Sequence, residues 1–370
     1  GSELAVIEGV MGLYDGKGFK DDSFSANHIA KLTKTPTILV VNIKGKSLSL
    51  VAEIKGYLGF MENRIAGVIL NNCSEGMYAI YKKLLEENGI KTYGYLPRVP
   101  EASIGSRHLG LVTAEEISDI KKKMDMLGKA AEKSLDLDGI MKLGKGAATL
   151  EYKDLTILPR RDESSVKIGI ARDKAFCFYY EDVLELFEDL GARLIPFSPV
   201  EDEHLPCDIS GLILGGGYPE LHIEKISQNK SMLKEIKKAS EDEMPIYAEC
   251  GGFMYLGESI EISGKKYKTV GAIEGNSHVA KSLVRFGYKD LEANVDNVLC
   301  RKGESIRCHE FHYSDTDSYG TGFTASNGRG RTWLTGKATK SMYAGYPHLH
   351  LWGNPGFAKS FIDACEMYGR

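Results

Sequence analysis

The stretch "EMPIYAECGGFMYLGE", residues 243–258, decides how this chain is built. A short apolar run ends at Cys250, two glycines follow, and an apolar helical pattern resumes at once. This order predicts a strand, a sharp turn and a helix, which is a nucleophile elbow with cysteine in place of serine. A helix N-terminus there favours the thiolate, and glycines 251 and 252 free backbone N–H groups for an oxyanion. The competing interpretation is a buried structural cysteine beside a glycine turn.

Apolar runs of strand length alternate with helical patterns on both sides of this stretch. The first half carries "LAVIEG" (4–9), "PTILVVNI" (36–43), "IAGVILNN" (65–72) and "TYGYLP" (92–97). A second alternation starts at "VKIGIARD" (166–173), and the region 260–345 has short apolar runs separated by glycines. This order predicts two α/β domains with mostly parallel sheets, the second extended by further strands. We expect the domains at residues 1–140 and 166–370, joined by a linker over 141–165.

The bulk composition excludes several classes of protein. The net charge of the 370 residues is −4, so no basic field indicates nucleic acid. No apolar run approaches the roughly 20 residues that span a bilayer. The seven cysteines are scattered without a C-x-x-C pair, which indicates a reducing compartment rather than a disulfide framework or a zinc ribbon. We therefore expect a cytoplasmic protein without nucleic-acid or membrane partners.

Two further motifs offer partners for Cys250. In "GLILGGGYPELH" (211–222) an apolar run ends in three glycines, which fits an oxyanion loop facing the thiol or a plain tight turn. In "GYPHLHLWGNP" (345–355), His348 and His350 share one face if the segment is a strand. One of them can then act as the base for Cys250 while the other orients it.

The remaining candidates are weaker. "RCHEFHYSD" (307–315) holds His309, Glu310 and His312, which bind a polar substrate or simply pack. Near the start, "VIEGVMGLYDGKG" places Glu8 after an apolar run and among glycines. A carboxylate at a strand end can hold Mg²⁺ against a nucleotide phosphate, although such a segment is usually just a glycine-rich loop. Residues 113–134 predict an amphipathic helix that starts with a capping box.

Together these segments resemble the cobyrinic acid a,c-diamide synthase family of glutamine-dependent amidases. The segments that match, in the family's order, are "EGVMGLYDG", "PTILVVNIKG", "GYLPR", "RHLGLVTAEE", "FCFYYEDVLELFEDLGA", "GGGYPELH", "AECGGFMYLGE", "HEFHYS" and "HLHLWGNP". The resemblance implies two fused domains. The first is similar to dethiobiotin synthetase and binds ATP and Mg²⁺, and the second is similar to class I glutamine amidotransferases.

The resemblance also implies roles for residues of the second domain. Cys250 matches the nucleophile that forms a glutamyl thioester and releases ammonia, and His348 matches the catalytic histidine. Gly251 and the Gly216-Gly217 turn match the oxyanion donors. Most triad amidotransferases carry a glutamate two residues after the histidine, where this chain has His350. The third member of the triad therefore stays open, with His350 as one candidate.

The first domain departs from the family in one respect. Family members open with a glycine-rich loop ending in Gly-Lys-Thr, and this sequence contains no G-x-x-x-x-G-K-[ST]. Glu8 matches the family's Mg²⁺-associated glutamate, but the phosphate loop that accompanies it is missing. We expect this chain to lack upstream sequence, with Gly1-Ser2 as a cloning scar.

The expected function is ATP- and glutamine-dependent amidation of the a and c acetate side chains of cobyrinate, in cobalamin biosynthesis. Its partners are glutamine, ATP and a cobyrinate-type tetrapyrrole. Three alternatives stay open: a nickel-sirohydrochlorin a,c-diamide synthase, a glutaminase without synthetase activity, and a non-catalytic tetrapyrrole-binding protein. A homodimer also stays open.

Overall fold

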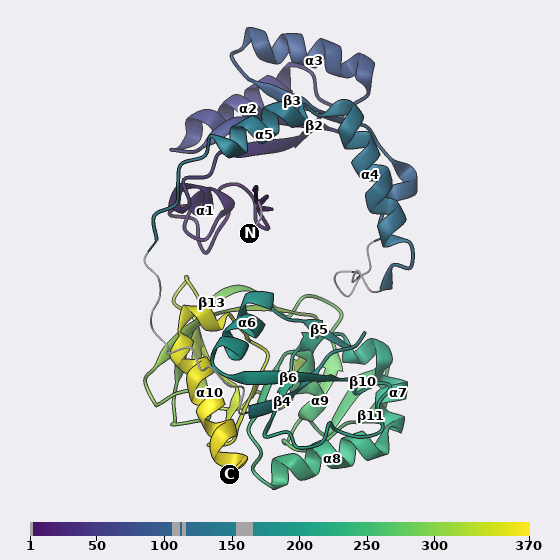
Figure 1. The fold of residues 1–370 in the computed structure, drawn as a ribbon, viewed down its shortest axis with the longest axis vertical. Helices are drawn as coiled ribbons and strands as arrows, with labels where there is room; N and C mark the ends of the chain where they lie inside the picture. The colour runs from purple at the N-terminus through teal and green to yellow at the C-terminus, as the bar shows by residue number, and fades with distance from the viewer. Residues whose placement is uncertain (1–2, 106–111, 113–115, 153–165) are drawn as a thin grey trace. The chain divides into compact units, whose positions relative to one another are not determined.

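The computed structural model describes residues 3–105, 112, 116–152 and 166–370. Its contacts divide the chain into two compact units, with the boundary between Lys153 and Asp154. In Figure 1 the N-terminal unit runs from purple to blue-green and the C-terminal unit from teal to yellow. No helix within these described ranges is long and apolar enough to cross a bilayer.

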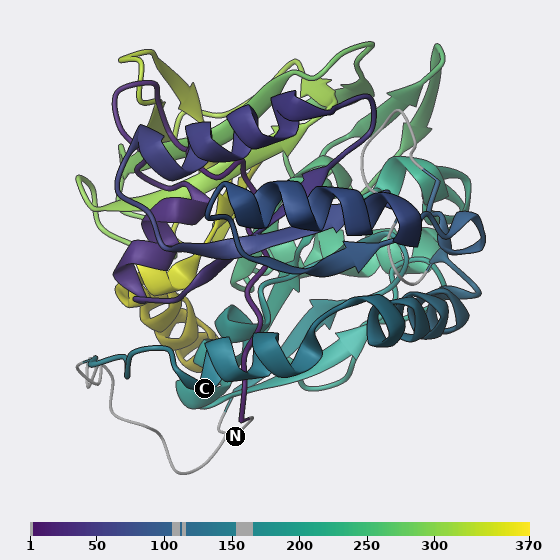
Figure 2. The same ribbon diagram turned by 90° about the horizontal axis from the view of Figure 1, so that it is seen from above.

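The N-terminal unit is built on a parallel sheet in the order β1-β2-β3. Its elements are α1 (Ala26–Leu32), β1 (Thr37–Asn42), α2 (Leu48–Phe60), β2 (Ile65–Asn71), α3 (Glu75–Glu87), β3 (Thr92–Leu96), η1 (Pro100–Ala102), α4 (Ile120–Ser134) and α5 (Leu137–Lys145). Helices α2 and α3 lie on one face of the sheet (Figures 1 and 2), where Ile54 and Leu85 pack against Val68 and Leu70. Helices α4 and α5 contact β3.

Two predictions for this unit are wrong. Residues 4–9 form no strand in the described chain, and Val6 and Ile7 are 87% and 60% exposed. An apolar run becomes a strand only where a neighbouring strand offers hydrogen bonds, and none of the described strands pairs with this run. Glu8 is consequently exposed instead of being held at a strand end.

Helix α4 begins at Ile120, later than predicted, and the predicted capping threonine lies outside the described residues.

The C-terminal unit is built on a larger sheet in the order β18-β19-β9-β7-β4-β6. Its elements are β4 (Val166–Ala171), β5 (Phe176–Phe178), α6 (Glu181–Asp189), β6 (Ala192–Phe197), β7 (Gly211–Leu214), β8 (Gly216–Gly217), η3 (Pro219–His222), α7 (Ile223–Gln228), α8 (Lys230–Glu241), β9 (Ile246–Glu249), α9 (Gly251–Leu256), β10 (Ser259–Ile262), β11 (Lys265–Lys268), β12 (Asn276–Val279), β13 (Arg285–Ala293), β14 (Ser305–His312), β15 (Ser314–Thr316), β16 (Phe323–Ser326), β17 (Thr332–Thr335), β18 (Lys337–Ala338), β19 (Met342–Gly345), β20 (His348–Leu349), η4 (Leu351–Gly353) and α10 (Pro355–Tyr368). All but β18 run parallel in this sheet.

Both faces of this sheet are covered, which explains why its strands are apolar throughout. Helices α6 and α10 pack on one face, where the rings of Phe187, Tyr247 and Phe361 meet with centroids 5.9–6.4 Å apart. Helices α7, α8 and α9 cover the other face. Burying one such aromatic side chain stabilises the fold by roughly 1.5–3 kcal/mol. The sheet is therefore a rigid base for the residues at its carboxyl edge.

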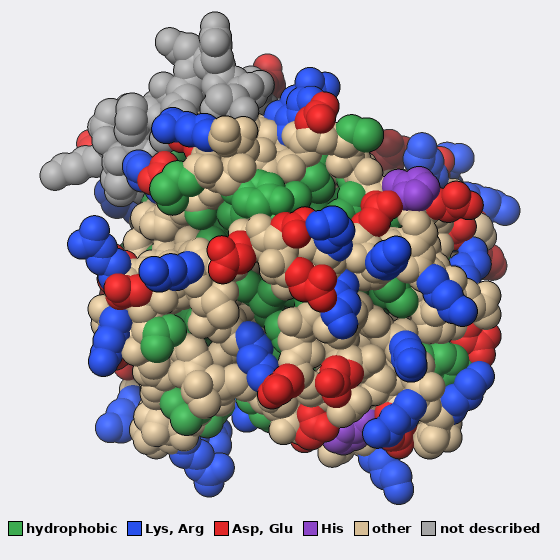
Figure 3. Space-filling model, turned by 90° about the horizontal axis from the view of Figure 1, so that it is seen from below, with side chains coloured by type: hydrophobic (Ala, Val, Ile, Leu, Met, Phe, Trp, Pro, Cys, Tyr) green, Lys and Arg blue, Asp and Glu red, His purple; other side chains and the backbone are tan. Residues whose placement is uncertain are grey.

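The predicted strands of the last third are confirmed. One additional sheet has the order β11-β10-β12-β15 and another the order β17-β16-β13-β14-β20. The second of these brings β14 beside β20, so that "HEFHYS" lies next to "HLH". On the face of the molecule drawn in Figure 3, Lys and Arg side chains are interspersed with Asp and Glu, and apolar side chains are exposed between them.

Candidate active site

Cys250 occupies the turn between β9 and α9, as the sequence predicts. Its φ and ψ are 47° and −99°, a conformation that costs energy in any residue with a side chain. The Cys250 N–H donates to the Gly345 carbonyl at 2.7 Å, and the Gly252 N–H donates to the Gly215 carbonyl at 3.0 Å. These bonds tie the elbow to the residues that end β19 and follow β7. The strained backbone conformation of Cys250 is thus stabilised by contacts with three neighbouring strands at the carboxyl edge of the sheet.

Two glycine positions allow the elbow to close. A Cβ added to Gly252 would lie 2.0 Å from the Leu214 carbonyl oxygen, so only glycine fits there. A Cβ added to Gly216 would lie 2.5 Å from Cε1 of His348, which shows how closely the glycine loop faces this ring. The loop is held by antiparallel pairing of β8 with β5. The backbone of "GGG" therefore lies beside the histidine, as expected of an oxyanion loop.

His348 lies on β20 with a side chain that is 13% exposed. It is in hydrogen-bonding contact with Cys250, and its Nδ1 lies 3.3 Å from Oε2 of Glu249. Burial by itself lowers the pKa of His348, but the contacts with Cys250 and Glu249 outweigh burial and raise this pKa to about 10. The structure thus favours an imidazolium beside the sulfur, which is the pairing that activates a cysteine nucleophile.

Glu249, which sequence reasoning missed, is the carboxylate of this site. It ends β9 directly before Cys250, and its side chain is 7% exposed. Its Oε1 accepts hydrogen bonds from the Leu349 N–H at 2.8 Å and from the Tyr247 hydroxyl. A charged residue inside the apolar run "PIYAEC" was the available signal, because such a side chain is rarely buried without a partner.

His350 does not lie at this site, although the sequence made it a candidate for the third member of the triad. Strand β20 ends at Leu349 and a 3₁₀ turn follows, so the two histidines do not share a strand face. Nε2 of His350 lies 2.9 Å from Oδ2 of Asp182, and the His350 ring meets the edge of Tyr180. The His350 and Asp182 side chains are 46% and 52% exposed.

Successive side chains of β14 point to opposite faces of the strand, so His309 lies on one face and Glu310 and His312 lie on the other. His309 pairs in register with His348, and burial, followed by the charge of His348, lowers its pKa to about 4. Glu310 is fully buried with Oε1 3.8 Å from Nη1 of Arg285, and burial raises its pKa. His312 is buried against Tyr346, with ring centroids 3.9 Å apart. Only His309 is therefore placed beside the catalytic candidates, and substrate contact by these residues stays a prediction.

The N-terminal unit carries a separate hollow of about 610 Å³. It lies where β1, β2 and β3 end, the edge at which parallel α/β sheets bind ligands. Its polar lining consists of Asn42, Lys44, Lys46, Asn72 and Arg98. Lys46 is paired with Glu53 at 2.5 Å. Lys44, Arg98 and the two amides remain as a set that suits an anionic ligand. Sequence reasoning missed these residues because they lie at the ends of three strands that are far apart in the chain.

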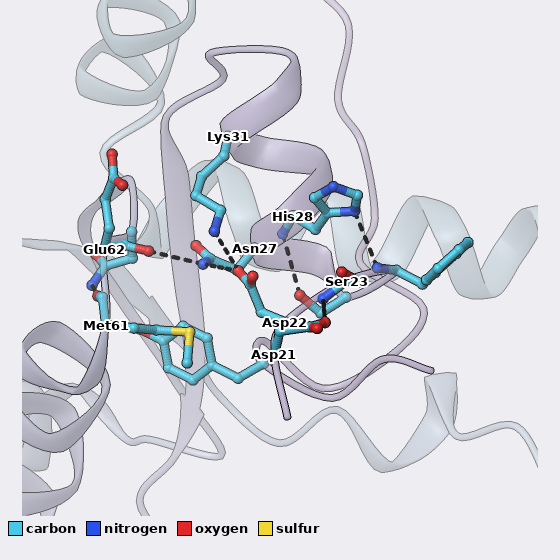
Figure 4. Close-up of polar contacts among 12 residues, drawn as sticks. Asp21, Asp22, Ser23, Asn27, His28, Lys31, Met61 and Glu62 are labelled. Atoms are coloured by element: carbon cyan, nitrogen blue, oxygen red, sulfur yellow. Dashed lines mark hydrogen bonds and ion pairs between the residues drawn. The ribbon is translucent and has the colours of Figure 1, made fainter. Parts of the chain in front are cut away.

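A polar cluster joins α1 to the residues directly before it (Figure 4). Lys31 pairs with Asp22 at 2.7 Å, and Asn27 Nδ2 donates to Asp22 at 2.7 Å and to the Glu62 carbonyl at 2.9 Å. The contact with Glu62 ties α1 to the segment that follows α2. Among the described residues there is no group of three or more His, Cys, Asp or Glu that could hold a metal ion, so Glu8 has no ready-made set of co-ligands.

Comparison with known proteins fits this geometry. Residues 167–356 match the CobB/CobQ-like glutamine amidotransferase domain. The chain is 43% identical over 97% of its length, and 82% of the relative's, to the cobyrinate a,c-diamide synthase of Clostridium tetani. It is 40% identical over its whole length, and again 82% of the relative's, to that of Caldanaerobacter subterraneus. The chain belongs to the cobyrinate a,c-diamide synthase family.

This family membership places Cys250, His348 and the glycine loop inside a matched amidotransferase domain. The hollow at the carboxyl edge of β1–β3 lies outside that domain but inside the region aligned with the synthase of Caldanaerobacter subterraneus. A chain in the structure of PurLQS from Thermotoga maritima covers 55% of this chain, with 99% of its own length aligned, at 18% identity. The TM-score of 0.40 is too low to bear on function.

Proposed function

We propose that this protein hydrolyses glutamine at Cys250 and delivers the ammonia to an ATP-activated carboxylate of a cobyrinate-type tetrapyrrole, as one step of cobalamin biosynthesis. The observation that carries the proposal is the strained elbow, which holds Cys250 against a buried His348 whose pKa is raised to about 10. The names of the relatives favour cobyrinate over nickel-sirohydrochlorin. All seven cysteines are free, which supports a cytoplasmic setting.

The proposed hydrolysis of glutamine uses these side chains in two steps. The Cys250 thiolate attacks the side-chain carbonyl carbon of glutamine, and the oxyanion is stabilised by N–H groups of Gly251 and of the Gly216-Gly217 turn. The His348 imidazolium donates its proton to the leaving nitrogen, the C–N bond breaks, and ammonia departs. The neutral imidazole then takes a proton from water, which attacks the thioester. The C–S bond breaks, glutamate leaves, and the thiolate–imidazolium pair is restored.

The N-terminal unit is proposed to be the dethiobiotin-synthetase-like half that handles ATP. Its hollow offers Lys44 and Arg98 to phosphate or carboxylate oxygens, and Asn42 and Asn72 to a base or ribose. Glu8 would supply one carboxylate to Mg²⁺, which would neutralise phosphate charge when bound there. Activation of the acceptor as an acyl phosphate gives ammonia a carbon that it can attack, with phosphate as the leaving group.

The test is covalent labelling with a diazoketone analogue of glutamine, read by intact-mass and peptide mass spectrometry. Stoichiometric labelling at Cys250 that is absent from Cys250→Ala supports the glutaminase. Cys207→Ala is the matched control, because that thiol is exposed and far from the elbow in sequence. Labelling spread over several cysteines, or none at Cys250, refutes it. Incubation with ATP, glutamine and cobyrinate, followed by mass analysis of the tetrapyrrole, tests the synthetase half separately.

A further inference from the structure

A single carboxylate faces the candidate catalytic histidine. Among the described residues, Glu249 is the only acidic side chain that forms an ion pair with His348, and its Oε2 lies 3.3 Å from Nδ1. A carboxylate only accepts hydrogen bonds, so Nδ1 carries the proton in this contact. The opposite ring nitrogen, Nε2, is then directed to Cys250. Glu249 therefore stands in the relation to His348 that the aspartate of a Ser-His-Asp triad has to its histidine.

The Glu249 carboxylate is itself held in a fixed orientation. Its other oxygen, Oε1, accepts the Tyr247 hydroxyl and the Leu349 N–H. Tyr247 lies on β9, two residues before Glu249, and Leu349 directly follows His348 on β20. One carboxyl group thus joins the strand of the nucleophile to the strand of the base. Such buried, satisfied partners fix both the tautomer and the orientation of an imidazole.

The other groups around His348 do not act as its carboxylate partner. Cys250 contacts the ring from the elbow, and His309 faces it from β14. Burial lowers the pKa of His309 to about 4, so His309 is neutral near neutral pH. Glu310 and His312 lie on the other face of β14 and influence His348 only through longer-range charge. His350 is engaged with Asp182.

We propose that Glu249, the residue directly before the nucleophile, is the positioning carboxylate of this glutaminase site: it holds His348 with Nε2 towards Cys250 and stabilises the imidazolium. This inference rests on the proposed function. It moves the carboxylate from a position after the histidine to the residue before the cysteine. Because Glu249 and Cys250 are adjacent at the end of β9, this one strand positions both the carboxylate and the nucleophile.

The experiment compares Glu249→Gln with the wild-type chain in two assays, the rate of Cys250 alkylation by the diazoketone across pH 5–10 and steady-state hydrolysis of glutamine. Glutamine keeps the shape of the side chain but removes its charge, so His348 loses its partner. We expect the alkylation rate and kcat to fall roughly 10²–10⁴-fold with KM changed less than about threefold. The basic limb of the pH profile should move to lower pH, which a merely structural role would not cause. Glu249→Asp, which restores the charge, should recover part of the rate.

A second pair of variants covers the case in which Glu249→Gln does not fold. Tyr247→Phe keeps the carboxylate but removes one of its anchors, and we expect a roughly 3–10-fold loss of alkylation rate with a displaced pH profile. Tyr255→Phe is the matched control, since it also removes one buried hydroxyl, which has no hydrogen-bond partner among the described residues. It should leave the rate unchanged.

The outcomes separate this inference from the proposed function. A wild-type chain that is not labelled at Cys250 refutes both. An active wild-type chain whose folded Glu249→Gln variant keeps its rate and pH profile refutes only the positioning role. Where Glu249→Gln is unfolded, Tyr247→Phe with the rate and profile of Tyr255→Phe refutes it in the same way.

Discussion

Two histidines that are two residues apart in the chain, His348 and His350, each pair with a carboxylate, and the two pairs have different properties. His348 and Glu249 are 13% and 7% exposed, whereas His350 and Asp182 are 46% and 52% exposed. The exposed pair has the shorter contact, 2.9 Å against 3.3 Å. Burial, and not contact distance, therefore distinguishes them, because a low-dielectric surrounding strengthens charge interactions that water would screen. The buried pair can tune catalysis, and the exposed pair fastens the start of α6 to the segment after β20.

The largest expected difference between the pairs is in activity. His348→Gln removes the group that carries the proton to the leaving nitrogen, so glutamine hydrolysis should fall by roughly 10³-fold or more. His350→Gln should change it less than about threefold, because His350 contacts neither Cys250 nor Glu249. Steady-state glutamate release by the two variants checks this. Equal losses in both would mean that His350 acts on the site after all.

The next difference is in stability. Glu249→Ala leaves His348 buried without its counter-charge, and we expect a loss of about 3 kcal/mol in the free energy of unfolding. Asp182→Ala removes a solvent-screened partner and should cost at most about 0.5 kcal/mol. Urea denaturation of both variants measures the contrast. Similar losses would show that burial does not separate the two pairs.

The pH dependence of stability gives a further distinction. The pKa of His348 is raised from 6.5 to about 10, so its stabilising contribution is complete below pH 6.5 and is lost as the pH rises to 10. The pKa values of His309 and His312 are lowered to about 4, mainly by burial, so their contributions are present above pH 6.5 and lost as the pH falls to 4. Thermal melting temperatures should therefore decline on both sides of neutrality.

Two variants check these assignments. The alkaline decline should shrink in His348→Gln, and the acid decline should shrink in His312→Gln relative to its own neutral-pH value. A melting temperature that is flat from pH 4 to 10 would contradict both.

The smallest expected effect concerns salt. The His350–Asp182 pair is exposed, so at a pH where His350 is protonated, raising the ionic strength to 1 M should remove its contribution of roughly 0.3 kcal/mol. The buried Glu249–His348 pair should keep its contribution. A double-mutant cycle at low and high salt measures each coupling energy. Greater salt sensitivity of the buried pair would reverse the comparison.

The local pattern around Cys250 was sufficient to predict its turn. Only glycine can approach the Leu214 carbonyl as closely as Gly252 does, two residues after the strained Cys250, and such geometry depends on a few consecutive residues. The strands that surround it were also readable, since a sheet covered on both faces needs continuous apolar runs. The run at residues 4–9 failed as a strand because pairing depends on a distant neighbour.

The carboxylate of the site was not readable in this way. The two-residue spacing of His348 and His350 made both of them candidates for the site, although their surroundings in the fold differ completely. The polar lining of the N-terminal hollow was missed for the same reason, because Asn42, Asn72 and Arg98 lie at the ends of separate strands and meet only in the folded sheet.

The amino-acid sequence by itself therefore determined the family, the elbow at Cys250 and the alternation that builds the two units. The tertiary structure alone decided which carboxylate serves His348 and which histidine stays at the surface. The physical reason is the distance along the chain between the residues that interact. Turn geometry and apolar periodicity are set by adjacent residues, whereas burial and charge partners arise when β9, β14 and β20 are brought together by the fold.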